Sequence, residues 1–148
     1  MTAKEKALAM LERRDYSRAE LLQKLTEKGV EEAEAAETVE RLAELGFVDD
    51  ARYAPIIVRH YAAKGYGARR VRQELQRRGI PKDLWDEAME QMPQQDDTVD
   101  RLLRSRLKSE APDRAELKKA QDFLLRKGYG WDEIRSALER YNSEIEEE

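Results

Sequence analysis

The sequence predicts an all-α protein, an elongated, curved array of three tandem three-helix repeats. Good helix formers dominate its 148 residues, while Val, Ile and Thr, which favour strands, are scarce. Charged residues make up 41% and hydrophobic residues 40%, which favours many thin amphipathic helices over one thick core. Helices this short are stable only when neighbours pack on them, so we expect stacked units that each contact mainly the next.

Three stretches that each begin with a tyrosine align with one another. They are YSRAELLQKLTEKGV from Tyr16, YGARRVRQELQRRGI from Tyr66 and YGWDEIRSALERYNS from Tyr129. Their matched apolar positions are Leu21, Val71 and Ile134, and four residues later Leu25, Leu75 and Leu138. Gly29 and Gly79 end the first two helices, and Asn142 takes that place in the third. Both residue types tolerate the left-handed conformation of a helix C-terminus, so the alignment predicts an irregular internal repeat.

The first predicted repeat covers residues 1–47 and is acidic. We expect Ser17 to cap its second helix and Gly46 to follow the end of its third. Between residues 27 and 50 the chain has nine acidic residues but only two basic ones, Lys28 and Arg41. The apolar sets that mark the three helices by their 3.6-residue period are Ala7, Leu8, Leu11; Leu21, Leu22, Leu25; and Ala35, Ala36, Val39, Leu42, Ala43.

The second predicted repeat covers residues 48–93 and is basic. Asp49 and Asp50 are placed to cap its first helix and to favour the helix dipole. Pro55 lies where this helix should already be hydrogen-bonded, so we expect an irregular first turn or a kink. Pro81 is expected at the first position of the last helix. The apolar sets are Ala54, Ile57, Val58, Tyr61; Ala68, Val71, Leu75; and Leu84, Trp85, Ala88, Met92.

The segment MPQQDD at residues 92–97 is the clearest connector, and the third predicted repeat follows it at residues 97–145. Its apolar sets are Val99, Leu102, Leu103, Leu107; Leu117, Ala120, Leu124; and Trp131, Ile134, Leu138, Tyr141. The last residues, 146–148, are expected to form a frayed acidic tail.

The sequence offers no constellation of residues for catalysis, so we expect a protein that is not an enzyme and binds no cofactor or metal. It has no cysteine and no P-loop, GxSxG or HExxH pattern. The single histidine, His60, is interpreted as a solvent-facing helical residue, because no fixed partner for a general base is visible. Gly65-Tyr66-Gly67 is too short to cradle a nucleotide and is interpreted as a turn between helices.

The N-terminal stretch MTAKEKALAMLERR is broken by charges and does not have the pattern of a secretory signal. No stretch approaches the ~18 uninterrupted apolar residues of a membrane span. We therefore expect a soluble cytoplasmic protein.

Between residues 52 and 82 the chain carries nine Lys and Arg residues and a single acidic one, Glu74. Seven of the nine are Arg, whose planar guanidinium suits recognition of phosphate or carboxylate. The candidate binding residues are Arg59, Lys64, Arg69, Arg70, Arg72, Arg77 and Arg78, with a secondary basic cluster at Arg101, Arg104, Arg106 and Lys108. The alternative interpretation is a solvated helix face on which Glu74 pairs with Arg70 or Arg78. The aromatic residues are interpreted as core or turn packing in preference to base stacking.

Three motifs stand out in the chain: GFVDDARYA at 46–54, KGYGARRVRQELQRRGI at 64–80 and FLLRKGYGWDEI at 123–134. In this order they resemble the RecX family, the bacterial regulators of the RecA recombinase. The family's fold, three tandem three-helix repeats, agrees with the fold predicted above. The chain departs from the family pattern at Pro55, where the family's helix continues, and at Ser17, which replaces the second Gly of the GYG turn.

The resemblance implies a non-enzymatic modulator that lies along the groove of the RecA–single-stranded DNA filament. Such a protein blocks filament growth and lowers ATPase, strand-exchange and coprotease activity, and so acts in DNA repair, DNA recombination and the SOS response. The implied partners are the RecA filament and, weakly or through the filament, single-stranded DNA; we expect a monomer that binds no membrane. The alternative left open is a stand-alone helical nucleic-acid-binding module that needs no recombinase.

Overall fold

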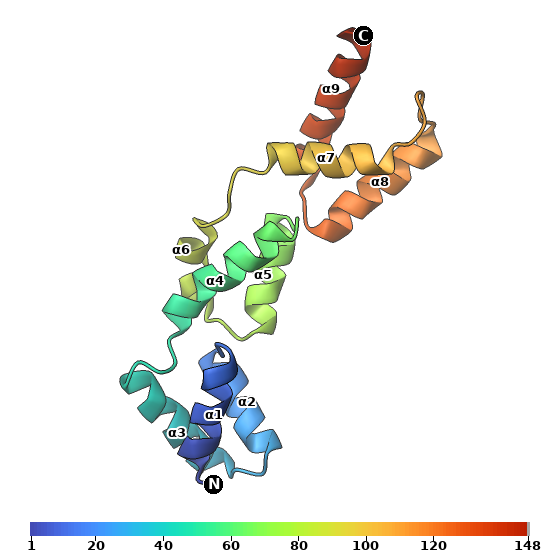
Figure 1. The fold of residues 1–148 in the computed structure, drawn as a ribbon. Coiled ribbons are helices and arrows are strands. Elements are labelled where there is room, and N and C mark those ends of the chain that lie inside the picture. The colour runs from blue at the N-terminus through green and yellow to red at the C-terminus, as the bar shows by residue number, and fades with distance from the viewer. Residues whose placement is uncertain (148) are drawn as a thin grey trace. The chain divides into compact units, whose positions relative to one another are not determined.

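The computed structural model describes residues 1–147, which fold into nine α-helices and one 3-10 turn without any strand (Figure 1). The elements are α1 (Ala3–Arg13), α2 (Arg18–Glu27), α3 (Glu32–Glu44), α4 (Asp50–Ala63), α5 (Ala68–Arg77), the 3-10 turn η1 (Lys82–Leu84), α6 (Trp85–Met89), α7 (Asp96–Arg106), α8 (Arg114–Lys127) and α9 (Trp131–Glu147). In chain order they make three successive three-helix modules. The predicted all-α class and its tandem three-helix organisation are confirmed.

The chain packs as two compact units, and the middle module contributes to both of them. The N-terminal unit consists of Met1–Val58 and Glu74–Gln91, and the C-terminal unit consists of Arg59–Gln73 and the chain from residue 92 onward. The division falls inside α4 and inside α5. Each of these two helices therefore has one part in the N-terminal unit and the other part in the C-terminal unit.

In the N-terminal unit α3 packs on both α1 and α2 (Figure 1). Thr2 and Ser17 each close a capping box with the Glu three residues later, so the predicted Ser17 cap is confirmed. The buried core agrees with the predicted helical period. Its members are Ala3, Ala7, Met10, Leu21, Leu25, Val30, Ala35, Val39, Leu42 and Val48.

At Pro55 an irregular first turn or a kink was expected; the irregular first turn is absent, and the kink stays a prediction. α4 continues from Asp50 to Ala63 with Pro55 inside it, and its first turn is closed by Asp49. Asp49 accepts the backbone N–H of Arg52 on Oδ1 (3.2 Å) and that of Tyr53 on its carbonyl oxygen (3.0 Å). Proline removes only a single donor, and this capped turn precedes it.

The last helix of the middle module is shorter than predicted and does not begin at Pro81. Pro81 precedes the 3-10 turn η1, α6 then covers only Trp85–Met89, and Met92 lies beyond it. Trp85 Nε1 donates to the carbonyl of Ile80 (2.9 Å), which fixes the start of this short helix.

In the C-terminal unit α7 packs on both α8 and α9 (Figure 1). Its buried core consists of Val99, Leu103, Leu107, Ala120, Leu124, Tyr129, Ile134 and Ala137. α9 extends to Glu147, so Asn142 lies inside a helix, and the prediction that it ends one is wrong. Residues 146 and 147 continue α9 where a frayed tail was predicted, and residue 148 lies outside the described residues.

The order of helices also corrects the internal alignment of the third module. The counterpart of α2 and α5 is α8, because all three are the middle helices of their modules. At the C-terminal end of each lies a basic residue followed by a glycine with positive φ: Lys28-Gly29, Arg78-Gly79 and Lys127-Gly128. The starts agree as well: SRAEL opens α2 and DRAEL opens α8, where Asp113 caps the helix as Ser17 does.

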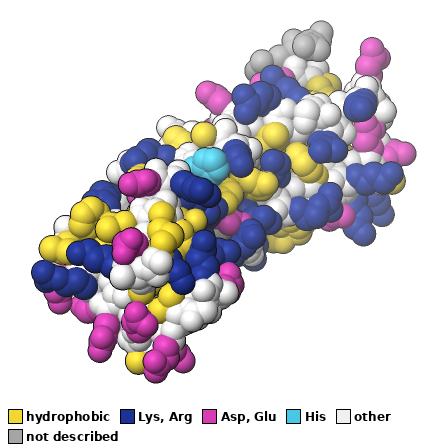
Figure 2. Space-filling model, turned by 60° about the horizontal axis from the view of Figure 1, so that its bottom comes forward, with side chains coloured by type: hydrophobic (Ala, Val, Ile, Leu, Met, Phe, Trp, Pro, Cys, Tyr) yellow, Lys and Arg dark blue, Asp and Glu magenta, His cyan; other side chains and the backbone are white. Residues whose placement is uncertain are grey.

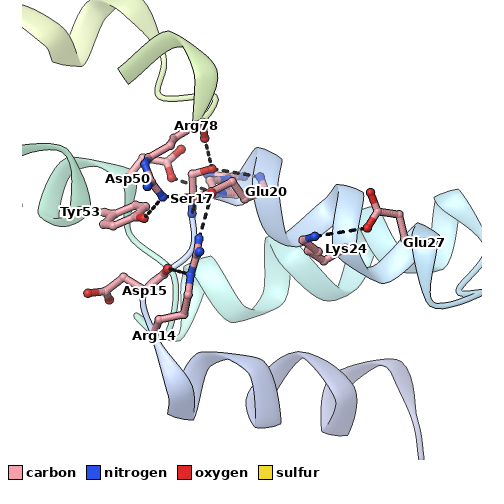
Figure 3. A network of polar contacts seen from close by, with 10 residues as sticks. Arg14, Asp15, Ser17, Glu20, Lys24, Glu27, Asp50, Tyr53 and Arg78 are labelled. Carbon is pink, nitrogen blue, oxygen red and sulfur yellow. Dashed lines mark hydrogen bonds and ion pairs between the residues drawn. The ribbon is translucent and has the colours of Figure 1, made fainter. Parts of the chain in front are cut away.

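In each unit the N-terminus of one middle helix meets the C-terminal turn of the next. In the N-terminal unit the Ser17 hydroxyl, at the start of α2, donates to the carbonyl of Arg78 at the end of α5 (Figure 3). In the C-terminal unit the N–H of Gly67, at the start of α5, donates to the carbonyl of Lys127 (2.8 Å). The N–H of Arg69 donates to the carbonyl of Gly128 (3.1 Å). The ends of helices have groups without intrahelical partners, and here they satisfy one another.

Tyr129 anchors the turn between α4 and α5 from within the C-terminal core. Its hydroxyl donates to the carbonyl of Gly65 (2.7 Å), and the side chain is fully buried. Burial, helped by Glu133, raises the pKa of Tyr129 to about 12. The hydroxyl is therefore held in its neutral, donating form.

Replacing Tyr129 by Phe is expected to lower the free energy of unfolding by about 1 to 2 kcal/mol at pH 8, because the Gly65 carbonyl loses its donor. The folded-state pKa, about 12, exceeds the value near 10 of an unfolded chain. The contribution of the neutral hydroxyl is therefore complete below pH 10 and is lost as the pH rises through 12. The difference between Tyr129→Phe and wild type should shrink by ~1.4 kcal/mol at pH 11. Urea denaturation followed by circular dichroism at both pH values measures it, and an unchanged difference would contradict the assignment.

Candidate partner-binding surface

The seven predicted basic residues of the middle module differ in how far the fold already uses them. Five of them are exposed: Arg59, Lys64, Arg69, Arg72 and Arg77. Arg70 and Arg78 are half-buried. Arg77 and Arg78 belong to the N-terminal unit and the other five to the C-terminal unit. The seven predicted residues therefore differ in exposure and are divided between the two units.

Arg78 is held inside the N-terminal unit by a network of polar contacts (Figure 3). Its guanidinium donates to the hydroxyl of Tyr53 (3.0 Å) and lies 3.6 Å from Glu20 Oε2, with 23% of the side chain exposed. Glu20 also pairs with Arg14 at 2.9 Å. Burial raises the pKa of Tyr53 and keeps its hydroxyl neutral. Arg78 thus ties the end of α5 to α2 and α4.

Asp50 joins the same region but caps a different helix from the one predicted. Its Oδ1 accepts the backbone N–H of Arg18, the first residue of α2, at 2.9 Å. The carboxylate is buried, and that burial raises its pKa. Asp49 caps α4 and Asp50 caps α2, so each of the two adjacent carboxylates caps a different helix. The pair holds helix ends, and no cluster of three or more metal-binding side chains occurs in residues 1–147.

Arg77 compensates a buried charge. The side chain of Glu74 is only 4% exposed, and its Oε1 lies 3.7 Å from Nη1 of Arg77, whose side chain is 76% exposed. Part of the positive charge of Arg77 is therefore used to stabilise a carboxylate inside the fold.

Arg69 and Arg72 are the arginines that remain available on α5. Both are exposed, and neither makes an ion pair with any residue in the described part of the chain. They lie three residues apart, so their side chains project from neighbouring positions of one helix.

Figure 2 shows dark blue Lys and Arg side chains beside the single histidine (cyan). His60 is exposed there and packs edge-on against Tyr61, which confirms its solvent-facing interpretation.

The secondary basic cluster is also divided by its contacts. Arg101 is exposed, whereas Arg104 pairs with Glu144 of α9. Arg106 lies over the ring of Phe123. Lys108 is exposed, and its backbone N–H donates to Glu116 (2.8 Å).

Cations and aromatic rings alternate across the C-terminal unit in an arrangement that we call the cation–aromatic ladder: Arg70, Tyr66, Lys127, Phe123 and Arg106. Arg70 Cζ lies 5.2 Å and Lys127 Nζ 4.4 Å from the centre of the Tyr66 ring. Lys127 Nζ lies 6.0 Å and Arg106 Cζ 3.8 Å from the centre of the Phe123 ring. All four distances lie within the range of cation–π attraction. Sequence reasoning missed Phe123 and Lys127 because they are far along the chain from Tyr66.

Every helix within residues 1–147 is too short or too polar to span a lipid bilayer.

Comparison with known proteins assigns the chain to a family along most of its length. Family models for the first, second and third three-helix domains of RecX match residues 3–42, 49–89 and 94–138. The chain is 37% identical over 140 residues to "Regulatory protein RecX" of Vibrio campbellii, covering 93% of this chain and 90% of the relative. It is 40% identical over 144 residues to "Regulatory protein RecX" of Stenotrophomonas maltophilia, covering 95% and 87%. The crystal structure of RecX from Lactobacillus salivarius shares the fold with a TM-score of 0.83 at 22% identity, covering 95% of this chain and 94% of that one. The chain therefore belongs to the RecX family of regulatory proteins.

Proposed function

We propose that this chain is a negative regulator of the RecA recombinase that binds in the groove of the RecA–single-stranded DNA filament. Binding there blocks filament growth and lowers ATPase, strand-exchange and coprotease activity. Membership of the RecX family supports the target. The observation that carries the contact is the exposed pair Arg69 and Arg72, which has no ion-pair partner in residues 1–147.

The distribution of basic and acidic residues along the chain is consistent with binding to a protein–DNA filament. A guanidinium pairs with carboxylate on a recombinase surface as well as with a DNA phosphate, and a filament groove offers both. The segment from residue 27 to residue 50, most of which belongs to the first module, has nine acidic residues against two basic ones, which repels bare phosphate. This arrangement favours the filament over naked DNA, and it acts mainly on encounter rate and register.

The test is the single-stranded-DNA-dependent ATPase of RecA, measured while this protein is titrated in. The double variant Arg69→Gln/Arg72→Gln should raise the half-inhibitory concentration about tenfold, equivalent to ~1.4 kcal/mol. A control with the same change in net charge, Arg13→Gln/Lys28→Gln, removes two exposed cations of the first module. The control should inhibit like wild type. If the α5 double variant also does, Arg69 and Arg72 belong to a solvated helix face.

The cation–aromatic ladder favours a second candidate function, a stand-alone helical nucleic-acid-binding module. Salt dependence separates the two candidates, because a protein that contacts Z phosphates of a single strand loses affinity with a log–log slope near -0.7Z. Equal affinity for naked and RecA-coated strands, with the same steep slope, would favour the stand-alone module. Tighter binding to the coated strand supports filament regulation.

A further inference from the structure

We propose that a hollow between the C-terminal end of α7 and the middle of α8 is a subsite for one nucleotide of a single-stranded nucleic acid. Phe123 is its base-stacking platform, and the surrounding cations hold the phosphate. The subsite rests on the proposed function for the biological source of the strand, which is the DNA inside the filament. Its own chemistry is tested without any recombinase.

The hollow has a volume of about 370 Å³, and its lining is strongly basic. Volumes of ~300 to 1,000 Å³ are typical of sites that hold small ligands. Besides Phe123 and Ser105, it is lined by a single carboxylate, Asp122. The four cations of the lining are Arg106, Lys108, Lys119 and Arg126.

None of these four cations forms an ion pair with a residue in the described part of the chain. Two of the cations, Lys119 and Arg126, come from α8. They lie on the same side of this helix as Asp122 and Phe123, because the four residues are spaced three or four positions apart. Uncompensated charges of one sign in a concave surface concentrate the electrostatic potential and attract an anion. The hollow is therefore suited to a phosphate group.

Phe123 gives the hollow its preference for a nucleotide over a simple anion. The ring is partly buried and packs against the C-terminal core, while Arg106 Cζ lies 3.8 Å from its centre. The guanidinium of Arg106 covers this face of the ring, so a nucleobase can stack on the guanidinium plane that the ring supports, or displace it and stack on the ring. A carboxylate of an acidic peptide can pair with the cations but gains nothing from the ring itself, because the face of an aromatic ring is negative.

The remaining residues of the cation–aromatic ladder extend the proposed binding surface for the strand beyond the hollow. Lys127 lies between Phe123 and Tyr66, and Arg70 lies on Tyr66 as Arg106 does on Phe123. A second base platform with its own cations thus follows the first. Rings alternating with cations suit a strand whose bases and phosphates alternate.

Fluorescence anisotropy with an oligothymidylate and with an abasic strand of the same length tests the platform. Phe123→Leu keeps an apolar side chain in the core but removes the ring. It should weaken oligothymidylate binding at least fivefold, as loss of one stacked base does, and leave the abasic strand unaffected. Phe47→Leu is the matched control, since Phe47 is 50% exposed in the N-terminal unit. It should bind both strands like wild type.

The phosphate part is tested by salt titration of Lys119→Gln. This variant should lower the salt slope by about 0.7 on both strands, as expected for one lost phosphate contact. Lys118→Gln is its control, because Lys118 is the exposed neighbour on α8 that does not line the hollow. Its slope should equal that of wild type.

Three outcomes would overturn the subsite: no binding of oligothymidylate by wild type at low salt, equal binding by Phe123→Leu, or an equal loss on the abasic strand. Competition by poly-glutamate that Lys119→Gln weakens and Phe123→Leu leaves unchanged would assign the hollow to an acidic protein segment instead. Because RecA is absent, these results are independent of the ATPase assay. Normal inhibition of RecA with no oligothymidylate binding rejects only the subsite, and the reverse result rejects only the proposed function.

Discussion

Replacing Gly67 by Ala is expected to lower the free energy of unfolding by about 3 kcal/mol. A Cβ atom at this position would lie 2.5 Å from the carbonyl oxygen of Gly128 and 2.6 Å from its carbon. These are backbone atoms and cannot rotate away, so α5 and the end of α8 must separate. Separation weakens the hydrogen bonds from Gly67 to Lys127 and from Arg69 to Gly128. Urea denaturation followed by helical circular dichroism measures the loss.

Gly130→Ala is the matched control for this prediction. Gly130 precedes α9 as Gly67 precedes α5, and neither glycine has a positive φ. A Cβ atom at Gly130 would meet only Glu133 Oε1, at 3.7 Å. The control should change stability by less than about 0.5 kcal/mol. A similar loss in both variants would mean that the close approach of backbones at Gly67 is not the cause.

The local features of the fold could be predicted because short-range chemistry decides them. Ser17 followed by Glu20 is a capping box, and the structure has it. The apolar period located the helices of all three modules, since the buried positions follow it. Asp49 was predicted as a cap on the same grounds.

Local similarity offers two registers for the third module and does not choose between them: RAEL pairs α8 with α2, whereas KGYG pairs α9 with α5. KGYG occurs at residues 64–67 after the first helix of a module and again at 127–130 after a middle helix. Both are glycine turns with the same sequence, but one follows the first helix of its module and the other follows the middle helix. Only packing, with α7 on α8 and α9, shows that Lys127-Gly128 corresponds to Arg78-Gly79.

The candidate site was only partly predictable because the arginines look alike in the sequence. Arg78 forms an ion pair with Glu20 and donates a hydrogen bond to Tyr53, and both residues lie far from it along the chain. Arg69 and Arg72 have the same neighbours in sequence but no such partners in residues 1–147. Which guanidinium stays available is thus set by tertiary contacts.

The corrected register also shows what compensates the basic residue near the start of α5. The third residue of α2 is Glu20 and that of α8 is Glu116, whereas the third residue of α5 is Arg70. A cation there is disfavoured by the helix dipole, and the capping carboxylate is lost with it. In α5 the carbonyls of Lys127 and Gly128 accept the first N–H groups instead. These carbonyls thus take the place of a capping side chain, so α5 can begin with a basic residue at its third position.

The same basic helix makes Leu75→Ala the most destabilising substitution expected, by about 3 to 5 kcal/mol. Four of the ten residues of α5 are Arg, and its fully buried apolar side chains are Val71 and Leu75. A helix of this length is not stable alone, so removing one of two apolar anchors leaves a cavity and weakens the packing that holds it. Gln76→Ala, at the exposed next position, is the control and should stay within about 0.5 kcal/mol of wild type. A loss below 1 kcal/mol for Leu75→Ala in urea denaturation would show that other contacts hold α5, and that its arginines do not depend on this anchor for their placement.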